Sequence, residues 1–351
     1  MQRGWAMDSP STLRSVLFVN FCKKFTEPEK SNDITYLIRT QQRRKKINML
    51  KSNMIDRGLR KVARESSLLQ SSLSYNWRAF QKRRKLPPLS PTNQCIVDAI
   101  RKEGAFITSL EALSLPLTKN LLEGAKVILA NNPTDPAFET QYVYHVDSAK
   151  IIENSEIFLW GLQERLLDIA ENYLGVPVAY RGPLFQKDFA NEQQVLTRLW
   201  HKDPEDHRLL KIAVYLSDVN AEGGPFEYIP KHFNSNLSSL KRQFLFSDAE
   251  VAKHLDPSNW VSCTGLAGTV VFFDSHHVFH RGKMPIKSHR DAIFFNYHSR
   301  KPIKVFSDHW KAPFSPEELL VLSKNISPRQ KECVFWWEKG AKSFQPKLMA
   351  R

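Results

Sequence analysis

The feature that most constrains the fold is a His-x-Asp pair, His201 and Asp203, followed at a distance by His280. Side chains two positions apart on a β-strand point to the same face, so His201 and Asp203 can reach one point while the residue between them points away. His280 lies 77 positions after Asp203. It can join the pair only if a later strand returns beside the first one, which requires a sheet built from strands that are distant in sequence.

Two imidazoles and one carboxylate are the ligand set of a facial triad, which holds divalent iron on one face and leaves the other positions open. Arg290, ten positions after His280, is the type of side chain that binds a carboxylate through two parallel hydrogen bonds. Together these residues predict an iron centre whose co-substrate carries a carboxylate. The alternative for Arg290 is a salt bridge at the end of a strand.

The segments around these residues have the composition of β-strands. They are rich in β-branched, aromatic and aliphatic residues, and Gly, Pro, Asn and Asp separate them. Several short strands bounded by such turns predict a mostly β protein with flanking helices, whose core is a double-stranded β-helix of the jelly-roll or cupin-like kind. The predicted strands are 105–108, 208–216, 226–230, 268–274 and 290–298, and the predicted helices are 93–103, 118–131, 154–174 and one that begins at 315.

From about Cys95 to Lys301 the chain resembles the phytanoyl-CoA dioxygenase superfamily of iron(II)- and 2-oxoglutarate-dependent oxygenases. The resemblance covers somewhat over half of the chain. Each of its motifs is weak singly, but the set is fairly specific. The matching motifs are Trp-His-Lys-Asp at 200–203, Gly-Gly-Pro-Phe at 223–226, Gly-Thr-Val-Val-Phe-Phe at 268–273, His-Arg-Gly at 280–282 and Ser-His-Arg at 288–290.

The resemblance implies roles for individual residues. In that family the equivalents of His201, Asp203 and His280 bind Fe(II), and the equivalent of Arg290 holds the distal carboxylate of 2-oxoglutarate, with Ser288 a weaker candidate helper. The implied activity is a dioxygenase that uses dioxygen to hydroxylate a small molecule at an unactivated C–H bond, with release of succinate and carbon dioxide. The primary substrate is not identified by these motifs.

Other histidines in the chain are alternative ligands. His276 and His277 also precede Arg290, but only His280 is followed by Arg-Gly and then by the arginine at the expected interval. A second His-x-Asp pair stands at His145 and Asp147. It lies ahead of a predicted helix and lacks the downstream strands, so the pair at 201 and 203 is preferred.

Charge divides the chain near residue 90. Residues 1–90 contain 20 Lys and Arg against 6 Asp and Glu, whereas residues 91–351 contain 31 against 30. A proline-rich stretch at 87–91 is typical of a linker. We therefore predict a basic, partly disordered or helical extension over 1–90, and an oxygenase domain with a C-terminal helical segment over 91–351. The extension is a candidate for contact with polyanions or anionic lipid surfaces; a solvated arm is the alternative.

Cysteine usage and hydropathy bear on the compartment. The four cysteines are scattered, with no CxxC pair, which favours a reducing, cytoplasmic setting. No apolar stretch approaches the length of a membrane span. Two other classes of function remain open: a zinc-dependent hydrolase with the same His/Asp/His set, and a non-enzymatic module that binds polyanions.

Overall fold

The computed structural model describes residues 63, 65–131, 141–240, 244–303 and 313–337. Contacts divide the chain into two compact units, residues 1–67 and residues 68–351. In the first unit, residues 65–67 are helical. Most of the predicted basic extension lies outside the described residues. The second unit contains every strand in the described part of the chain.

Nine strands are present in the described residues, and they form two antiparallel sheets. The strands are β1 (Ala105–Ser109), β2 (Val143–His145), β3 (Val178–Asp188), β4 (Leu210–Tyr215), β5 (Phe226–Tyr228), β6 (Val261–Cys263), β7 (Thr269–Asp274), β8 (His280–Gly282) and β9 (Arg290–Ser299). The larger sheet has the order β1-β7-β4-β9-β3-β2, and the smaller sheet has the order β6-β5-β8. Neighbours in each sheet are distant in sequence, as the spacing of the predicted ligands required.

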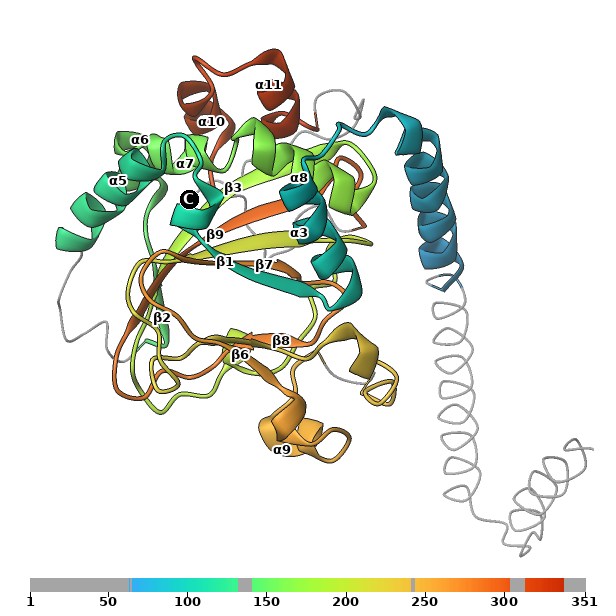
Figure 1. The fold of residues 1–351 in the computed structure, drawn as a ribbon, viewed down its shortest axis with the longest axis vertical. Coiled ribbons are helices and arrows are strands. Elements are labelled where there is room, and N and C mark those ends of the chain that lie inside the picture. Colours follow the sequence, from blue (N-terminus) through green and yellow to red (C-terminus); the bar gives the residue numbers. More distant parts are fainter. Residues whose placement is uncertain (1–62, 64, 132–140, 241–243, 304–312, 338–351) are drawn as a thin grey trace, which may run out of the picture. The chain divides into compact units, whose positions relative to one another are not determined.

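The two sheets lie face to face (Figure 1). Apolar side chains from both sheets pack together between them. The rings of Phe226 on β5 and Phe273 on β7 lie 4.1 Å apart, and the Tyr215 hydroxyl on β4 donates a hydrogen bond of 2.8 Å to the Cys263 carbonyl on β6. Successive side chains of a strand point to opposite faces of the sheet, so in the larger sheet one set points into the space between the sheets and the other set points toward the helices. The predicted jelly-roll architecture with flanking helices is confirmed.

Helices precede, interrupt and follow the strands. The labelled ones are α3 (Pro91–Lys102), α4 (Leu110–Leu113), α5 (Thr118–Ala130), α6 (Ser148–Glu153), α7 (Glu156–Trp160), α8 (Glu164–Leu174), α9 (Asp248–Ala252), α10 (Pro316–Leu322) and α11 (Pro328–Val334), and a further helix covers residues 65–82. Five of them (α3, α4, α9, α10 and α11) begin at a serine that caps the first turn. In α10 the Ser315 hydroxyl accepts from the Glu318 amide, and the Glu318 carboxylate accepts from the Ser315 amide. Among the described residues, no helix has both the length and the apolar composition to cross a membrane.

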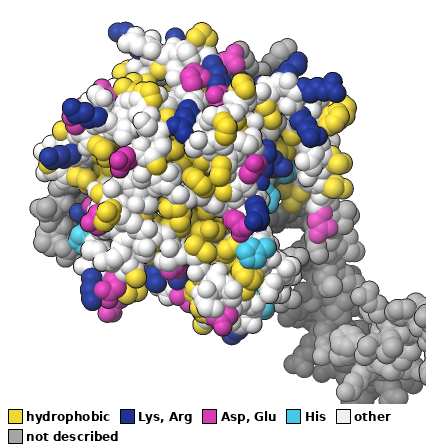
Figure 2. Space-filling view, viewed as in Figure 1, with side chains coloured by type: hydrophobic (Ala, Val, Ile, Leu, Met, Phe, Trp, Pro, Cys, Tyr) yellow, Lys and Arg dark blue, Asp and Glu magenta, His cyan; other side chains and the backbone are white. Residues whose placement is uncertain are grey.

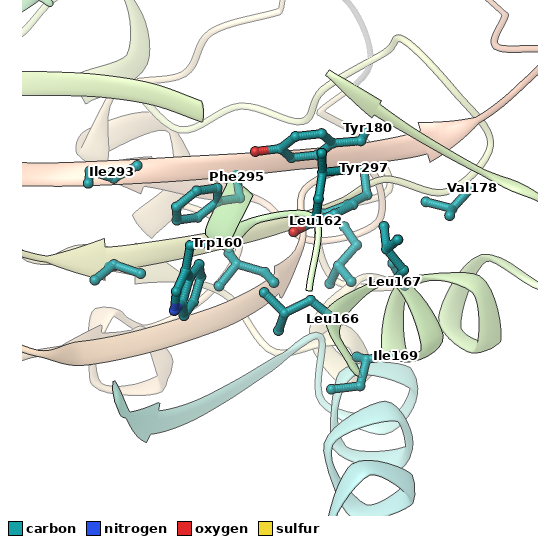
Figure 3. Close-up of a cluster of buried hydrophobic side chains, with 14 of the residues drawn as sticks. Trp160, Leu162, Leu166, Leu167, Ile169, Val178, Tyr180, Ile293, Phe295 and Tyr297 are labelled. Atoms are coloured by element: carbon teal, nitrogen blue, oxygen red, sulfur yellow. The ribbon is translucent and has the colours of Figure 1, made fainter. Parts of the chain in front are cut away.

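The outer face of the larger sheet is covered by helices, and the main core lies at this junction (Figure 3). Leu166 and Trp160 from the helices meet Phe295 and Tyr297 from β9, and all four side chains are at most 1% exposed. Burying side chains of this size contributes about 1.5–3 kcal/mol each to folding. This side of the sheet is therefore structural, and the functional side chains lie on the other face.

The helix predicted over 154–174 is wrong in one respect, because it is two helices. α7 ends before Gly161, and α8 begins at Glu164. A side chain at Gly161 would clash with the Tyr180 hydroxyl and would come within 2.6 Å of the Phe295 ring. The Gly161 carbonyl also accepts a hydrogen bond of 2.7 Å from the Tyr297 hydroxyl. Packing against the sheet therefore breaks the helix where the sequence pattern continued it.

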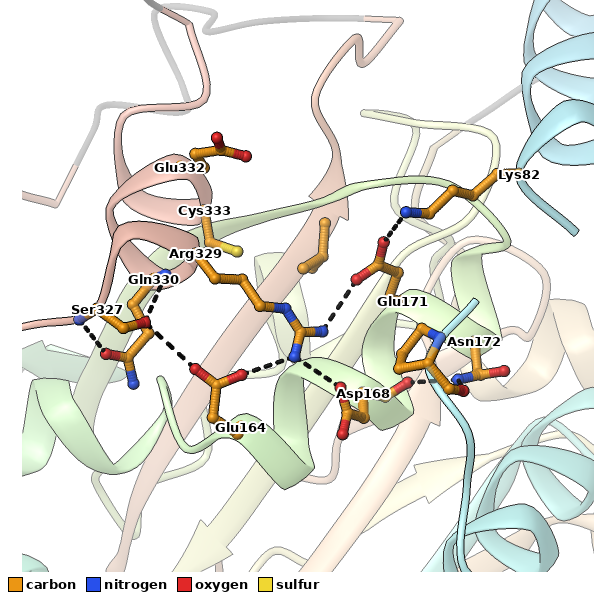
Figure 4. A network of polar contacts seen from close by, with 12 residues as sticks. Lys82, Glu164, Asp168, Glu171, Asn172, Ser327, Arg329, Gln330, Glu332 and Cys333 are labelled. Atoms are coloured by element: carbon orange, nitrogen blue, oxygen red, sulfur yellow. Dashed lines mark hydrogen bonds and ion pairs between the residues drawn. The ribbon is translucent and has the colours of Figure 1, made fainter. Parts of the chain in front are cut away.

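A polar network attaches the C-terminal helices to α8 (Figure 4). Arg329 at the start of α11 contacts Glu164 at 2.6 Å, Asp168 at 2.7 Å and Glu171 at 3.0 Å. Although burial lowers the pKa of Arg329, its hydrogen bonds to Asp168 and Glu171 raise that pKa overall. One cation shared by three carboxylates fixes the predicted C-terminal helical segment on the domain.

Residues 68–90 also contact the domain. Tyr75 is 2% exposed, and its hydroxyl donates to the Leu174 carbonyl at 2.6 Å. Lys82 forms an ion pair of 3.0 Å with Glu171 (Figure 4), and Asn172 donates to the Pro87 carbonyl at 2.9 Å. The boundary predicted at residue 90 remains a prediction. These contacts make residue 68 the conservative starting point for a truncated form of the second unit.

Candidate metal centre

The two predicted histidine ligands are brought together by a main-chain pair. The amide of His201 donates to the carbonyl of His280 at 3.0 Å, and the amide of His280 donates to the carbonyl of His201 at 2.9 Å. Residues opposite each other in an antiparallel pair project their side chains to the same face. The imidazole rings consequently lie 4.3 Å apart between centroids. Only isolated bridges form here, so the strand-like character expected around His201 is confined to this short pairing.

Asp203 completes the cluster. Its amide donates to the Ser275 carbonyl at 2.8 Å, which fixes the chain two residues after His201. Asp203 Oδ1 lies 3.8 Å from His201 Nε2, and Asp203 Oδ2 lies 3.7 Å from His280 Nε2. One ligand atom from each residue lies within 4.8 Å of the others. In the described residues this is the one group of three or more His, Cys, Asp and Glu side chains with such geometry.

Hydrogen bonds select the same nitrogen of both histidines for a metal. Nδ1 of His201 lies 2.8 Å from the Leu199 carbonyl, and Nδ1 of His280 lies 3.2 Å from the Val278 carbonyl. A carbonyl accepts only from a protonated nitrogen, so each Nδ1 carries the hydrogen and each Nε2 keeps its lone pair. Both free lone pairs belong to the atoms nearest Asp203. This arrangement is typical of metal-binding histidines.

The protonation states favour a cation. Burial lowers the pKa of His201, and it lowers the pKa of His280 to about 3, so both rings are neutral near pH 7. Burial alone would raise the pKa of Asp203, but Lys211 and the two histidines lower it well below its ordinary value. The cluster therefore offers two neutral nitrogens and one carboxylate. This donor set fits a divalent metal without any prior loss of a proton.

Lys211 on β4 is a further member of the site. Its Nζ lies 2.5 Å from Asp203 Oδ2, and its side chain is only 19% exposed. A cation on one carboxylate oxygen leaves the other oxygen as the better donor to a metal. Lys211 therefore holds the Asp203 carboxylate in one orientation.

Arg290 extends from β9 across the space between the sheets. Its Nη2 would lie 2.6 Å from a Cβ atom placed on Gly282, so β8 can pass beside the guanidinium only because residue 282 has no side chain. Nε and Nη2 donate to Asp188 Oδ2 at 3.2 and 2.8 Å, and Nη1 donates to the Gly224 carbonyl. Burial opposes the charge, but Asp188 raises the pKa of Arg290. The side chain thus lies beside the strand that carries His280, and two of its five N–H groups are not used by these contacts.

The other residues considered as candidates do not add a side chain to the cluster. Ser288 is exposed, and its Oγ faces Gly223. His276 bonds to the Asp203 carbonyl at 2.9 Å, and His277 bonds to the Asp274 carboxylate at 2.9 Å. His145 ends β2, and Asp147 caps α6, so the second His-x-Asp pair is divided between two elements. None of these four alternative ligands belongs to the group formed by His201, Asp203 and His280.

Sequence reasoning missed four charged residues near the predicted site. Lys211 and Asp188 contact Asp203 and Arg290 directly. Burial, followed by Asp203, raises the pKa of Glu205 to about 7. Burial lowers the pKa of Arg181 to about 9, and the nearby carboxylates of Glu205 and Asp203 oppose that shift. A signal existed for Lys211, because it is a lone charge within the apolar segment 209–216.

A pH dependence of stability should come from His298, a buried neutral histidine outside the cluster. Burial lowers its pKa to about 4, its Nδ1 bonds to the Ser299 carbonyl at 2.8 Å, and its ring packs on Trp336. Below pH 6.5 the unfolded chain gains a proton that the folded protein excludes, so stability decreases as pH falls from 6.5 to about 4. Urea unfolding at about pH 7 and about pH 5 should show a loss of roughly 2 kcal/mol from this residue.

The control is His298→Asn, whose amide can replace the Nδ1 donor. This variant should lose less stability between the two pH values than the wild type. An unchanged difference would mean that other groups account for the pH dependence.

No protein-family model matches the chain, and no curated protein matches it in sequence. Several solved structures are similar. EctD from S. alaskensis has 21% sequence identity over 65% of this chain and 85% of that chain, with a TM-score of 0.43. The epimerase SnoN in complex with Fe3+, alpha ketoglutarate and nogalamycin RO has 17% identity over 60% of this chain and 85% of that chain, with a TM-score of 0.41. EvdO2 from Micromonospora carbonacea var. aurantiaca, complexed with 2-oxoglutarate, has 16% identity over 63% of this chain and 95% of that chain, with a TM-score of 0.42. Similarity at this level assigns neither a reaction nor a substrate.

Proposed function

We propose that the chain is an Fe(II)- and 2-oxoglutarate-dependent dioxygenase of the phytanoyl-CoA dioxygenase superfamily. The observation that carries the proposal is the cluster of His201, Asp203 and His280 inside a jelly roll, with both Nε2 lone pairs available. Two nitrogens and one oxygen on one face leave positions open for other ligands. A closed structural zinc site would use a fourth protein ligand instead.

In this proposal Arg290 binds the distal carboxylate of 2-oxoglutarate. Its guanidinium is buried between the sheets beside β8, and Asp188 fixes its orientation from the side of Nε. The N–H groups that Asp188 and Gly224 leave unused can donate to a carboxylate. Ser288 remains a weaker candidate, because its side chain is exposed.

On β3 and β9, two apolar side chains that point toward the smaller sheet are less deeply buried than those on the helix-covered face. On β3 and β9 the helix-facing side chains of Phe185, Ile293 and Phe295 are at most 1% exposed. Their neighbours Leu184 and Phe294, which point to the other face, are only half-buried. We infer that a small substrate approaches beside these two side chains, one of which lies on the strand that carries Arg290. Apolar side chains there suit a substrate that is oxidised at a C–H bond.

The proposed reaction is hydroxylation. Iron bound by the three ligands would supply the activation of dioxygen. One oxygen atom of dioxygen enters the substrate as a hydroxyl group, the other enters succinate, and carbon dioxide leaves 2-oxoglutarate. The protein contributes three ligands of fixed orientation, a cationic partner for the co-substrate and an interior shielded by two sheets.

The test is a substrate screen that follows succinate release. The protein is purified anaerobically, loaded with Fe(II), and supplied with 2-oxoglutarate and dioxygen. We expect succinate to form slowly without a primary substrate and faster when the panel contains one. If no condition produces succinate, and zinc-loaded protein hydrolyses an ester or amide in the same panel, the dioxygenase proposal fails and the hydrolase alternative replaces it.

A further inference from the structure

The helix that runs through residues 68–82 has one face packed on the domain. Tyr75 is buried and bonds to the Leu174 carbonyl, and the Ser71 hydroxyl lies 2.9 Å from His207 Nε2. Two helical turns after Tyr75, Lys82 pairs with Glu171. These residues recur at intervals of four and seven, so they define one side of the helix.

The opposite side of the same helix is apolar and exposed. Leu69, Leu73, Trp77 and Phe80 follow each other at intervals of four, four and three, and each is 60–68% exposed. The rings of Trp77 and Phe80 stack with centroids 6.0 Å apart. We call these four residues the apolar stripe. On a surface helix the apolar side normally faces the domain, so a continuous apolar stripe on the side that faces away indicates a binding surface.

A groove lined by arginines begins at the C-terminal end of the stripe. Its volume is about 370 Å³, and Phe80 belongs to both the groove and the stripe. Three guanidiniums line the groove, those of Arg83, Arg101 and Arg208. Its other lining residues are Ala79, Leu86 and Gly175.

The arginines of the groove are only partly engaged. Arg101 donates to the Asn172 carbonyl at 2.7 Å, and Arg208 donates to the Tyr173 carbonyl at 3.2 Å. The nearest acidic partner of Arg101, Asp98, is 3.8 Å away and well exposed. Burial, and then the neighbouring Arg208, lower the pKa of Arg101, as expected for cations held close together. Guanidiniums grouped beside apolar side chains are a site for a phosphate that carries an apolar portion.

We propose that the apolar stripe and the arginine groove form a docking surface for a membrane of anionic phospholipid. The stripe would enter the boundary between headgroups and acyl chains, and the arginines would bind lipid phosphates. Phe80 joins the two parts, which places the apolar and the cationic contacts next to each other. On the face in Figure 2, hydrophobic and basic side chains lie together along the upper right edge, where Figure 1 draws this helix.

The charge of the chain favours a lipid surface over other occupants. Residues 82–85 are Lys-Arg-Arg-Lys, and residues 1–90 have an excess of 14 positive charges. A second copy of the chain would bring equal positive charges together, whereas an anionic membrane attracts them. A nucleic acid could satisfy the arginines, but it would leave the aliphatic Leu69 and Leu73 without an apolar partner. This surface is separate from the metal site, so its test does not depend on the proposed reaction.

The test uses the full chain and co-sedimentation with vesicles. Phosphatidylcholine alone is compared with phosphatidylcholine that contains phosphatidylserine. Three variants are compared with the wild type: Leu73→Gln/Trp77→Gln/Phe80→Gln on the stripe, Arg83→Gln/Arg84→Gln at the basic end, and Leu266→Gln/Ile286→Gln as the control. Leu266 and Ile286 are 72% and 57% exposed and lie far from this helix in sequence, so they test exposed apolar residues in general.

We expect the wild type and the control to sediment with anionic vesicles and much less with neutral ones. The stripe variant should lose this binding, and each arginine removed should weaken it roughly fivefold. Circular dichroism should show that the variants remain folded. If the stripe variant binds vesicles as well as the wild type does, the proposal is overturned in favour of a soluble polyanion. The same conclusion follows if single-stranded DNA binds as tightly as vesicles and the stripe substitutions leave that binding unchanged. A dimer of the wild type that the stripe variant abolishes, without vesicle binding, would overturn it in favour of a second copy.

Discussion

Replacing Asp203 by alanine should abolish both metal retention and 2-oxoglutarate turnover. The carboxylate is the only charged member of the cluster, and its two oxygens lie 3.7–3.8 Å from the two histidine Nε2 atoms. Loss of a residue that merely orients a metal ligand costs 10–100-fold in metal affinity or activity, so loss of a ligand should cost more than about 100-fold. Metal content after anaerobic loading and succinate release measure the two effects separately.

The control is Asp147→Ala, which removes the aspartate of the other His-x-Asp pair. Asp147 caps α6 without a side-chain hydrogen bond, so its loss should change neither measurement. If Asp203→Ala keeps its metal while remaining folded, the assignment of the cluster as the metal site is incorrect.

Replacing Arg290 by methionine should have the second large effect, on both stability and co-substrate binding. Arg290 and Asp188 are each 2% exposed, and they pair at 2.8 Å. Removing one partner of a buried ion pair leaves an uncompensated charge and costs about 3–5 kcal/mol. Urea unfolding measures this loss. Titration of 2-oxoglutarate into Mn(II)-loaded protein should show an affinity roughly 30-fold lower, because a hydrogen bond to a charged group is worth about 2 kcal/mol.

A second variant separates the two roles of Arg290. In Arg290→Met/Asp188→Leu neither buried charge remains, so the free energy of unfolding should recover most of its loss. The affinity for 2-oxoglutarate should not recover, because the guanidinium is still absent. Recovery of both quantities would mean that Arg290 is a structural partner of Asp188. Lys211 would then become the leading candidate to bind the co-substrate.

Much of the fold could be predicted because the strands carry local signals. The runs of aliphatic, β-branched and aromatic residues at 208–216, 268–274 and 290–298, with the turn residues that bound them, predicted β4, β7 and β9 within about two residues of their ends. Helix starts were predictable where a capping box was visible, as at Ser315. The break at Gly161 was not predictable, because its cause is the approach of Tyr180 and Phe295 from strands that follow α7 in the sequence.

The candidate ligands could be selected from the sequence because side chains two positions apart in extended backbone, such as His201 and Asp203, point to the same side. The choice between His276, His277 and His280 depended on the motif that follows His280. The main-chain pair between His280 and His201 gives that choice a second, structural basis. The roles of Arg290 and Ser288 remain predictions.

The sequence by itself determined the residue types at the site, the strands that carry them and the unequal distribution of charge. Those properties follow from short-range periodicity and composition, which do not depend on how the sheets close. Only the tertiary structure decided which charged side chains pair with one another at the site. Asp188 meets Arg290 across 102 positions. Lys211 meets Asp203 because Asp203 bonds to the residue that follows β7, and β7 is the neighbour of β4 in the sheet. Likewise, only packing of Tyr75 on the domain turned Leu69, Leu73, Trp77 and Phe80 outward, because one face of a helix becomes exposed when the opposite face is buried.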